Sequence, residues 1–262
     1  MKREKNKIVL NIPHCSTNGI FDKNIGCWPC NQFFVNDCVN KWTDWFVDFL
    51  FGGLSRRDNV ETVVFPYSRF VCDAERLKND PLDKNGNGII YNRFDGYERR
   101  TLTDEQITRI MGIWSKHQEK LANAIMDENT ILVDCHSFPS DVSDCNICIG
   151  HNSVSVPSFC FVDVSDCNIC IGHNEDWSYD KRIVDGVVRI FKNSGYTVEI
   201  NKPYSNSITP PKDFHYKSIM IEVNKRIYMN ERTLHLENSP LKWMRWNGAL
   251  REVHNFLVHS EL

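Results

Sequence analysis

Short apolar runs alternate with longer amphipathic stretches along the chain, and this alternation restricts the folds that it can adopt. The apolar runs have the length of buried strands, and the amphipathic stretches have the length and spacing of helices that cover a sheet. Strands that alternate with helices favour a sheet with helices on both faces. The pattern therefore predicts an α/β fold, with strands at residues 7–12, 62–65 (continuing to 71), 130–135, 168–171, 197–200 and 218–223, and helices at residues 34–51, 104–126, 179–193 and 240–259.

Three of the predicted helices carry residues that are typical of helix ends. Thr103 followed by Gln106 has the spacing of a capping box, in which each side chain bonds the backbone N–H of the other residue. Gly195 suits the end of the third helix, and Ser239 followed by Pro240 suits the start of the last. No Pro- or Ser-rich linker separates the elements. We therefore expect residues 1–262 to form a single domain.

The composition argues against several classes of partner. The chain has 262 residues and a formal net charge of −3, so it lacks the basic excess of a protein that binds nucleic acid without regard to sequence. No apolar run approaches the roughly 20 residues of a membrane span. The basic residues 1–5 lead into an apolar run at 8–10 that is too short for a signal peptide. We expect a cytoplasmic protein that binds neither nucleic acid nor membranes.

The chain contains eleven cysteines, which is many for a cytoplasmic protein. A disulfide scaffold is not expected in a chain of this size. Part of the excess comes from a duplication, because residues 141–152 recur letter for letter as residues 163–174. Two copies are too few for a repeat fold. We expect one copy to be structural and the other, with the linker 153–162, to be an insertion.

The duplication also creates the spacing of a four-cysteine zinc site, with Cys145, Cys148, Cys167 and Cys170 as its members. Against this, each copy has the pattern of a short strand, on which cysteines three residues apart point to opposite faces. Cys27 and Cys30 have the spacing of a redox pair but lie in a predicted loop. Structural roles are the main expectation, and a non-catalytic protein with a Cys-based structural zinc site is the alternative.

Polar residues stand at the ends of the predicted strands. His14 follows the first strand, Asp134 and His136 end the third, and Glu222 lies near the end of the last. Open α/β sheets carry their chemistry beyond the carboxyl ends of the strands. Asp134 and His136 are two residues apart and share one face, so the carboxylate can support the histidine as a metal ligand. Histidine and carboxylate ligands predict a zinc site with an open position for water.

Six short segments surround these positions and follow one another from about residue 8 to residue 230: Ile12-Pro13-His14, residues 68–76, Asp134-Cys135-His136-Ser137, Ile171-Gly172, Asn201-Lys202-Pro203-Tyr204 and residues 221–229. In these segments the chain resembles the N-formylglutamate amidohydrolase family. The resemblance implies a mixed-sheet fold like that of the zinc carboxypeptidases (phosphorylase/hydrolase-like). It also implies metal-dependent hydrolysis of a small-molecule N-acyl amino acid such as N-formylglutamate, giving formate and the free amino acid.

The resemblance also suggests roles for individual residues. It implies that His14 and His136 bind Zn²⁺, with Asp73 as the third ligand. Asp73 could instead stand behind His14, in which case Glu75 is the reserve ligand. Glu222 would be the general base that takes the proton of the attacking water and returns it to the leaving amine.

Arg76 matches the arginine that holds the substrate carboxylate in related zinc carboxypeptidases and aspartoacylases, although Glu75 replaces the Asn of their Asp-x-Asn-Arg motif. Arg69 would take a second carboxylate, since a planar guanidinium binds carboxylates in a bidentate manner. Asn201 and Tyr204 complete the predicted substrate-binding set. The following residues 205–207 depart from the Gly-Gly of many family members, so a related zinc amidase or carboxypeptidase-like enzyme for another N-acyl amino acid or small peptide is the second expectation.

Overall fold

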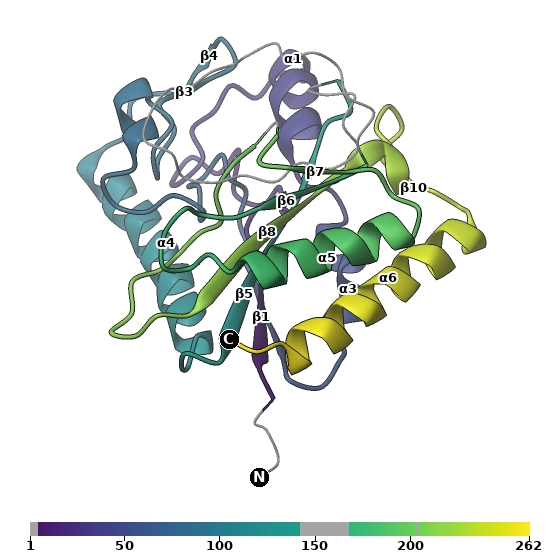
Figure 1. The fold of residues 1–262 in the computed structure, drawn as a ribbon. Coiled ribbons are helices and arrows are strands. Elements are labelled where there is room, and N and C mark those ends of the chain that lie inside the picture. The colour runs from purple at the N-terminus through teal and green to yellow at the C-terminus, as the bar shows by residue number, and fades with distance from the viewer. Residues whose placement is uncertain (1–4, 142–167, 203) are drawn as a thin grey trace.

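A six-stranded sheet forms the centre of the computed structural model, which describes residues 5–141, 168–202 and 204–262 (Figure 1). The strand order is β2-β1-β5-β8-β6-β7. Neighbouring strands are parallel except for β6 and β8, which are antiparallel, so the sheet is mixed as predicted. The strands are β1 (Lys7–Ile12), β2 (Val60–Val64), β5 (Thr130–Phe138), β6 (Ile169–Gly172), β7 (Val198–Ile200) and β8 (Lys217–Asn224).

Helices cover both faces of this sheet, which confirms the predicted α/β architecture (Figure 1). Ile8 and Leu10 of β1 pack in the same core as α5 (Lys181–Asn193) and α6 (Pro240–His259). Val9, between them, packs against α4 (Asp104–Ala124) on the opposite face. Because side chains alternate along a strand, the next positions on the α4 side are Asn11 after Val9 in β1 and Asp134 after Leu132 in β5. His136 follows Asp134 by two residues in β5.

The predicted capping residues are confirmed, although α4 ends at Ala124 instead of residue 126 and α5 begins at Lys181 instead of residue 179. Thr103 Oγ1 accepts a hydrogen bond from the Gln106 N–H, and Gln106 Oε1 accepts one from the Thr103 N–H, so α4 begins with a capping box. Ser239 caps α6, and Pro240 is its first residue. Gly195 follows α5 with a φ of 77°, a left-handed conformation that glycine adopts without strain.

The prediction of one helix at residues 34–51 is wrong. The chain forms α1 (Gln32–Phe34), a π-helical turn η1 (Val35–Asn40), α2 (Val47–Leu50) and α3 (Gly52–Ser55) instead. The helical turns stop at Trp42, and Phe46, with a left-handed backbone and a φ of 62°, precedes α2. The Asp44 N–H bonds the His14 carbonyl at 3.0 Å rather than a carbonyl of a preceding helical turn. This break brings a buried carboxylate to the end of β1.

The second predicted strand also differs, because β2 stops at Val64 instead of running on to residue 71. Its partner strand β1 ends at Ile12, which is paired with Val64, and the last bond between the two segments runs from the Phe65 N–H to the Ile12 carbonyl at 3.0 Å. Short elements that were not predicted are β3 (Arg93–Phe94), β4 (Tyr97–Glu98), β9 (Met229–Asn230), β10 (His235–Leu236) and the 3₁₀ turns η2 (Pro81–Asn85) and η3 (Lys225–Ile227).

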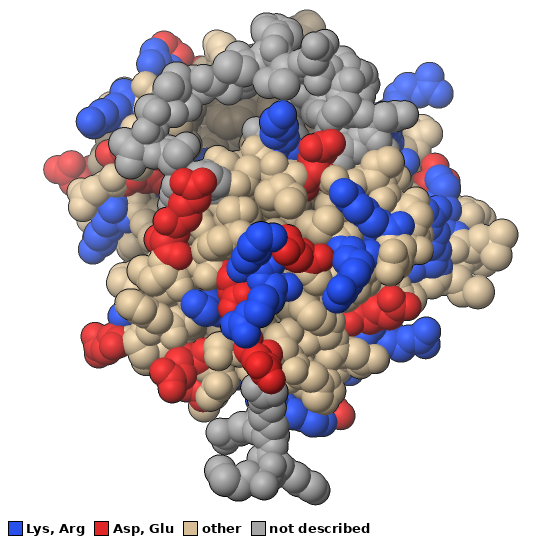
Figure 2. Space-filling view, in the orientation of Figure 1, with Lys and Arg blue, Asp and Glu red and all other residues tan. Residues whose placement is uncertain are grey.

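The distribution of charged side chains on the surface and the hydropathy of the helices can be compared with the sequence. On the face drawn in Figure 2, acidic and basic side chains are interspersed rather than gathered into one basic patch. Within the described ranges, no helix combines the length and the apolar character that crossing a bilayer requires.

Candidate active site

The carboxyl ends of three neighbouring strands carry polar residues that the sequence singled out. His14 follows β1 by two residues, His136 lies in β5 and Glu222 lies in β8. His136 and Glu222 are directly opposite each other in the parallel β5–β8 pair. All three side chains are buried. The sheet therefore places the two predicted ligands and the predicted base at one edge.

The two histidines share the carboxylate of Asp44. Their ring centroids are 5.1 Å apart, and Asp44 Oδ2 lies 3.2 Å from His136 Nδ1 and 3.8 Å from His14 Nδ1. Burial alone would raise the pKa of Asp44, but the hydrogen bond from His136 and the neighbouring His14 outweigh burial and lower that pKa. Asp44 was not predicted, because the sequence placed it inside a helix. The pair Thr43 and Asp44 was a usable signal, since both residue types favour helix starts over helix interiors.

Asp73 stands behind His14, on the side away from Asp44. Its Oδ1 accepts a hydrogen bond from His14 Nε2 at 2.7 Å, and its Oδ2 accepts bonds from Arg69 Nη2 at 3.2 Å and from the Tyr91 hydroxyl. Burial alone would raise the pKa of Asp73, but His14 and the two nearby arginines hold it well below its usual value. An ionised Asp73 accepts the Nε2 hydrogen of His14. It thereby leaves Nδ1, which lacks a hydrogen-bond partner within the described ranges, facing Asp44.

Asp134 lies beside His136, within ion-pair distance, although His136 Nε2 has no hydrogen-bond partner among the described residues. Its Oδ1 lies 3.2 Å from His136 Nε2 and accepts a hydrogen bond from Asn11 Nδ2 at 2.7 Å, while its Oδ2 accepts one from the Ile208 N–H. Burial would raise the pKa of Asp134, but His136 and these hydrogen bonds lower it. Burial would lower the pKa of His136, but Asp134, followed by Glu75, raises it well above its usual value.

Three groups of side chains in the described part of the chain have ligand atoms close enough to hold one metal ion: His14–Asp44–His136, His14–Asp73–Glu75 and Glu75–Asp134–His136. The predicted set of His14, Asp73 and His136 is not among them. Only the first group contains both histidines. In that group the other ring nitrogens face Asp73 and Asp134, as is usual behind metal-binding histidines. Two imidazole nitrogens and a carboxylate fit Zn²⁺. One of these nitrogens, His14 Nδ1, has no hydrogen-bond partner among the described residues.

Glu222 is a buried carboxyl group beside this set. Its Oε2 has no hydrogen-bond partner among the residues that the structure describes. Burial raises the pKa of Glu222 well above its usual value; His136 opposes the shift, and Asp44 and Glu75 reinforce it. A carboxyl group whose pKa is raised holds a proton more readily, which suits a group that takes up a proton and returns it.

Arg69 and Arg76 lie at the cluster rather than on the surface. Arg69 Nη2 is 3.2 Å from Asp73 Oδ2, and Arg76 Nε is 4.0 Å from the same oxygen. Arg76 Nη1 is also 3.7 Å from Glu75 Oε2. Only 14% and 20% of the two arginine side chains are exposed. The carboxylates therefore hold both guanidinium groups at the edge of the site.

Asn201 and Tyr204 lie just beyond the end of β7. Asn201 Oδ1 accepts a hydrogen bond from the His173 N–H at 3.4 Å. The Tyr204 ring packs edge-on against Phe138, with centroids 6.2 Å apart. Phe138 is two residues beyond His136 on β5, so this ring contact connects Tyr204 to the strand that carries His136.

The alternative four-cysteine zinc site lies mostly outside the described residues, because Cys145, Cys148 and Cys167 fall in the range 142–167. Cys170 is buried in β6. None of the three candidate metal groups found in the described residues contains a cysteine. The four-cysteine site thus stays a prediction.

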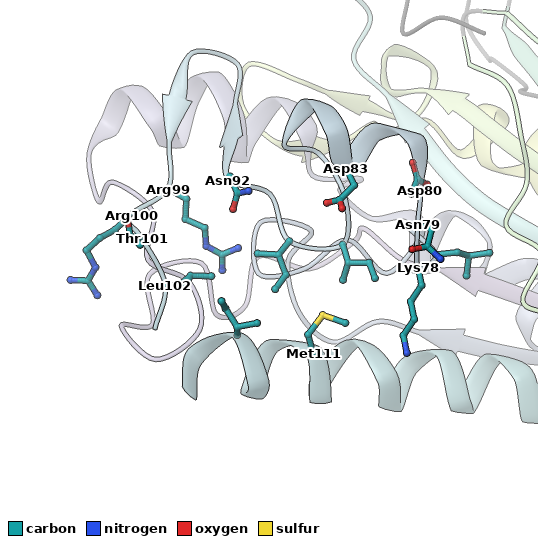
Figure 3. A pocket seen from close by; sticks show the side chains of 14 residues that line it. Lys78, Asn79, Asp80, Asp83, Asn92, Arg99, Arg100, Thr101, Leu102 and Met111 are labelled. Carbon is teal, nitrogen blue, oxygen red and sulfur yellow. The ribbon is translucent and has the colours of Figure 1, made fainter. Parts of the chain in front are cut away.

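A cavity of about 730 Å³ lies elsewhere, between α4 and the segment 77–102 (Figure 3). Its walls include Ile89, Ile90 and Met111, with Arg99 reaching toward it. Arg99 donates its hydrogen bonds to backbone carbonyls, among them those of Gly26 and Val71, so it joins loops together. No member of the histidine–carboxylate cluster lines this cavity.

The mixed sheet and the buried histidine–carboxylate cluster at its carboxyl edge define an α/β protein with the groups that hydrolytic chemistry needs. Residues 7–229 match the family model of N-formylglutamate amidohydrolase (FGase), and the chain therefore belongs to this family of amide hydrolases.

Two solved structures are similar to this chain. The N-formylglutamate amidohydrolase from Ralstonia eutropha JMP134 is 18% identical with a TM-score of 0.68, over 98% of this chain and 94% of that one. The gene product Atu2144 from Agrobacterium tumefaciens is 16% identical with a TM-score of 0.63, over 96% and 92%. At these identities the likeness shows the fold. No curated protein matches the chain.

Proposed function

We propose that this protein is a zinc-dependent amidohydrolase that cleaves the formyl amide of N-formylglutamate, or the acyl amide of a similar N-acyl amino acid, to give formate (or the corresponding acid) and the free amino acid. The observation that carries the proposal is the Asp44 carboxylate that faces Nδ1 of both His14 and His136. Membership of the FGase family supports an amide as the substrate.

His14, His136 and Asp44 would hold the zinc ion. The sequence predicts Asp73 as the third ligand, but the distances favour Asp44, because Asp73 is already bonded to His14 Nε2 and Arg69. In this arrangement Asp73 keeps the hydrogen of His14 on Nε2 and leaves Nδ1 for the metal. Bound zinc lowers the pKa of a bound water toward about 7 and polarises the scissile carbonyl.

Glu222 is the proposed general base. Its Oε2 takes a proton from the attacking water, and the same oxygen returns that proton to the nitrogen of the leaving amine. Its position opposite His136 places it next to a proposed ligand. Its raised pKa suits both halves of the cycle, since a base that is too acidic accepts a proton poorly.

Arg69 and Arg76 are proposed to bind the carboxylates of the substrate. N-Formylglutamate has two carboxylates, and the two guanidinium groups stand side by side on Asp73 at the edge of the cluster. The Nε atoms of both arginines are buried without hydrogen-bond partners among the described residues. Asn201 and Tyr204 would contact the rest of the substrate from the end of β7.

The test of this proposal combines metal analysis with the Glu222→Gln substitution. Gln has the size of Glu but cannot take up the proton, so kcat should fall by about 10²–10⁴-fold. The variant should keep a wild-type zinc content, because Glu222 is not a ligand in the proposed site. Zinc content is measured on the purified protein, and turnover is followed as formate released from N-formylglutamate.

Glu61→Gln is the matched control, since Glu61 pairs with Lys7 at 2.6 Å on the surface. It should keep full activity. A purified wild-type chain that holds no zinc, and gains no activity when zinc is added, would contradict the metal-dependent enzyme. Unchanged turnover in Glu222→Gln would remove Glu222 from its role.

The second candidate, an amidase for another N-acyl amino acid, is favoured by one observation. Glu75 stands where the related motif has Asn, and its carboxylate lies 3.7 Å from His136 Nε2. The added negative charge should weaken binding of an anionic substrate group at this point. Comparing formate release from N-formylglutamate with acetate release from N-acetyl amino acids separates the two substrates.

A different test addresses the Cys-based structural zinc site. Loss of zinc on replacement of Cys145 and Cys148, but not on replacement of His14 or His136, would favour that site.

A further inference from the structure

A chain of buried polar contacts connects α4 to the back of His136. His117, on the inner face of α4, bonds through Nε2 to Asn11 Oδ1 at 3.1 Å. Asn11 Nδ2 donates to Asp134 Oδ1 at 2.7 Å, and the same oxygen lies 3.2 Å from His136 Nε2. All four residues are buried. Asn11 and Asp134 are also direct neighbours in the parallel β1–β5 pair, so the strand register fixes the middle of the chain.

The chemistry of the groups sets the direction of the hydrogen bonds. The carboxylate of Asp134 only accepts, so Asn11 must turn its NH₂ group toward Asp134 and its carbonyl oxygen toward His117. His117 therefore donates from Nε2. Burial lowers the pKa of His117 to about 4, so at neutral pH the ring is uncharged and carries its single hydrogen on Nε2.

Packing alone does not account for a histidine at this position. His117 Nδ1 is buried with no hydrogen-bond partner in the described ranges, and such an atom costs free energy. The ring packs edge-on against Phe65, with centroids 5.1 Å apart, a contact that a phenylalanine would make equally well. What the histidine adds is the hydrogen bond to Asn11.

We propose that His117 is a positioning residue, which acts through Asn11 and Asp134 to fix the orientation of the His136 ring and thereby strengthens zinc binding. The inference rests on the proposed function, in which His136 is a zinc ligand. Without the His117 donor, the Asn11 amide can turn, Asp134 loses a fixed neighbour and the His136 ring gains freedom. Partners that orient metal-binding histidines change metal affinity by about 10–100-fold. Because His117 acts through two further residues, we expect a loss of about tenfold, at the lower end of that range.

Three variants of the full chain separate positioning from stability. His117→Phe removes the donor and keeps an aromatic ring, whereas His117→Gln keeps an N–H near the place of Nε2. Leu121→Val changes a buried residue one helical turn along the same face of α4 and disturbs the core without touching the polar chain. Zinc affinity is measured by competition with a chelator at neutral pH. The visible spectrum of the Co²⁺-loaded protein reports the geometry of the ligands.

The proposal expects His117→Phe to lose about tenfold in zinc affinity and to alter the Co²⁺ spectrum. It expects His117→Gln and Leu121→Val to stay within about twofold of wild type in affinity, with unchanged spectra. Equal zinc affinities in wild type and all three variants would overturn the positioning role of His117 and leave the zinc enzyme intact. Equal losses of affinity in all three variants would also overturn it, because they would mark a general loss of stability. A wild-type protein that binds no zinc would overturn the proposed function, and this inference with it.

Discussion

At the scale of residues, three aspartates surround the rings of two histidines. Asp44 faces the Nδ1 atoms of both rings, and Asp73 and Asp134 each stand at one Nε2. All five side chains are buried, so removing one partner leaves another charge without compensation, which is usually strongly destabilising. In the proposed enzyme Asp44 would be a zinc ligand, together with the two histidines, whereas Asp73 and Asp134 would only support the histidine rings. The two kinds of aspartate should therefore respond differently to the same substitution.

The first prediction compares Asp44→Asn with Asp73→Asn. If Asp44 is the third ligand, Asp44→Asn should lower zinc affinity by more than about 100-fold, whereas Asp73→Asn, which loses only the support behind His14, should lower it by about 10–100-fold. Chelator competition measures both values. Asp48→Asn, an exposed aspartate four residues from Asp44, should bind zinc as wild type does. A larger loss in Asp73→Asn than in Asp44→Asn would restore Asp73 as the ligand.

At the scale of elements, the pattern of apolar residues predicted what local sequence determines. β1 has the predicted bounds, and α4 starts where Thr103 and Gln106 indicated. The prediction of one helix at residues 34–51 was wrong because the break in this segment depends on a residue distant in sequence. The Asp44 N–H bonds the carbonyl of His14. The spacing of hydrophobic residues does not predict such a tertiary contact.

The residues of the candidate site also fall into those that local sequence predicts and those that depend on tertiary contacts. His14, His136 and Glu222 could be predicted, because each polar residue follows or ends an apolar run that had to be a buried strand. Asp44 could not be placed at the site without knowing where the helix breaks. His117 sits on the inner face of a regular helix, where a histidine in sequence is indistinguishable from any buried core residue.

The second prediction concerns the duplicated segment. In the structure the second copy supplies β6, at Ile169–Gly172, which pairs with β8 next to Glu222. Deleting residues 141–162 joins Ser140 to Asp163 and restores an identical local sequence, because residues 163–174 repeat residues 141–152. Shortening the connection between two elements changes its closure entropy only slightly, if the connection is flexible. The deletion variant should therefore keep its zinc affinity and turnover, with a Tm within a few degrees of wild type.

Two substitutions in the full chain provide the matched control, since Ile149 and Ile171 occupy the same place in the two copies. Ile171 is fully buried in β6, so Ile171→Asp should lower the Tm strongly. Ile149→Asp should leave it close to wild type. The reverse result would assign β6 to the first copy, and equal damage from both would mean that both copies are structural.

At the scale of the whole molecule, the candidate site and the core of the fold are the same region. β1, β5 and β8 are adjacent central strands, and the polar chain that runs from His136 to α4 crosses between two of them. Protonation inside this region therefore changes the free energy of unfolding as well as the site. His117 is suited to a test of this coupling, because it is buried and lies outside the proposed ligand set.

The third prediction is an acid-induced loss of stability that depends on His117. The pKa of this residue is lowered from 6.5 to about 4 in the folded state, so between these values the unfolded chain binds a proton that the folded chain does not. Stability is then unaffected above pH 6.5, falls as the pH drops toward 4, and reaches its full loss below that. At about 1.4 kcal/mol per pKa unit, the total is about 3 kcal/mol.

Urea unfolding of the chelator-treated protein at several pH values from 7 to 4 measures this loss free of any contribution from bound metal. The free energy of unfolding of wild type should fall relative to that of His117→Gln across this range, because Gln takes up no proton. His235→Gln, which removes an exposed histidine, should keep the wild-type dependence. If wild type and His117→Gln lose stability in parallel down to pH 4, the folded protein accepts a proton on His117. The pKa of His117 in the folded protein would then lie near its ordinary value of 6.5, and burial in the polar chain would not be what keeps the ring neutral.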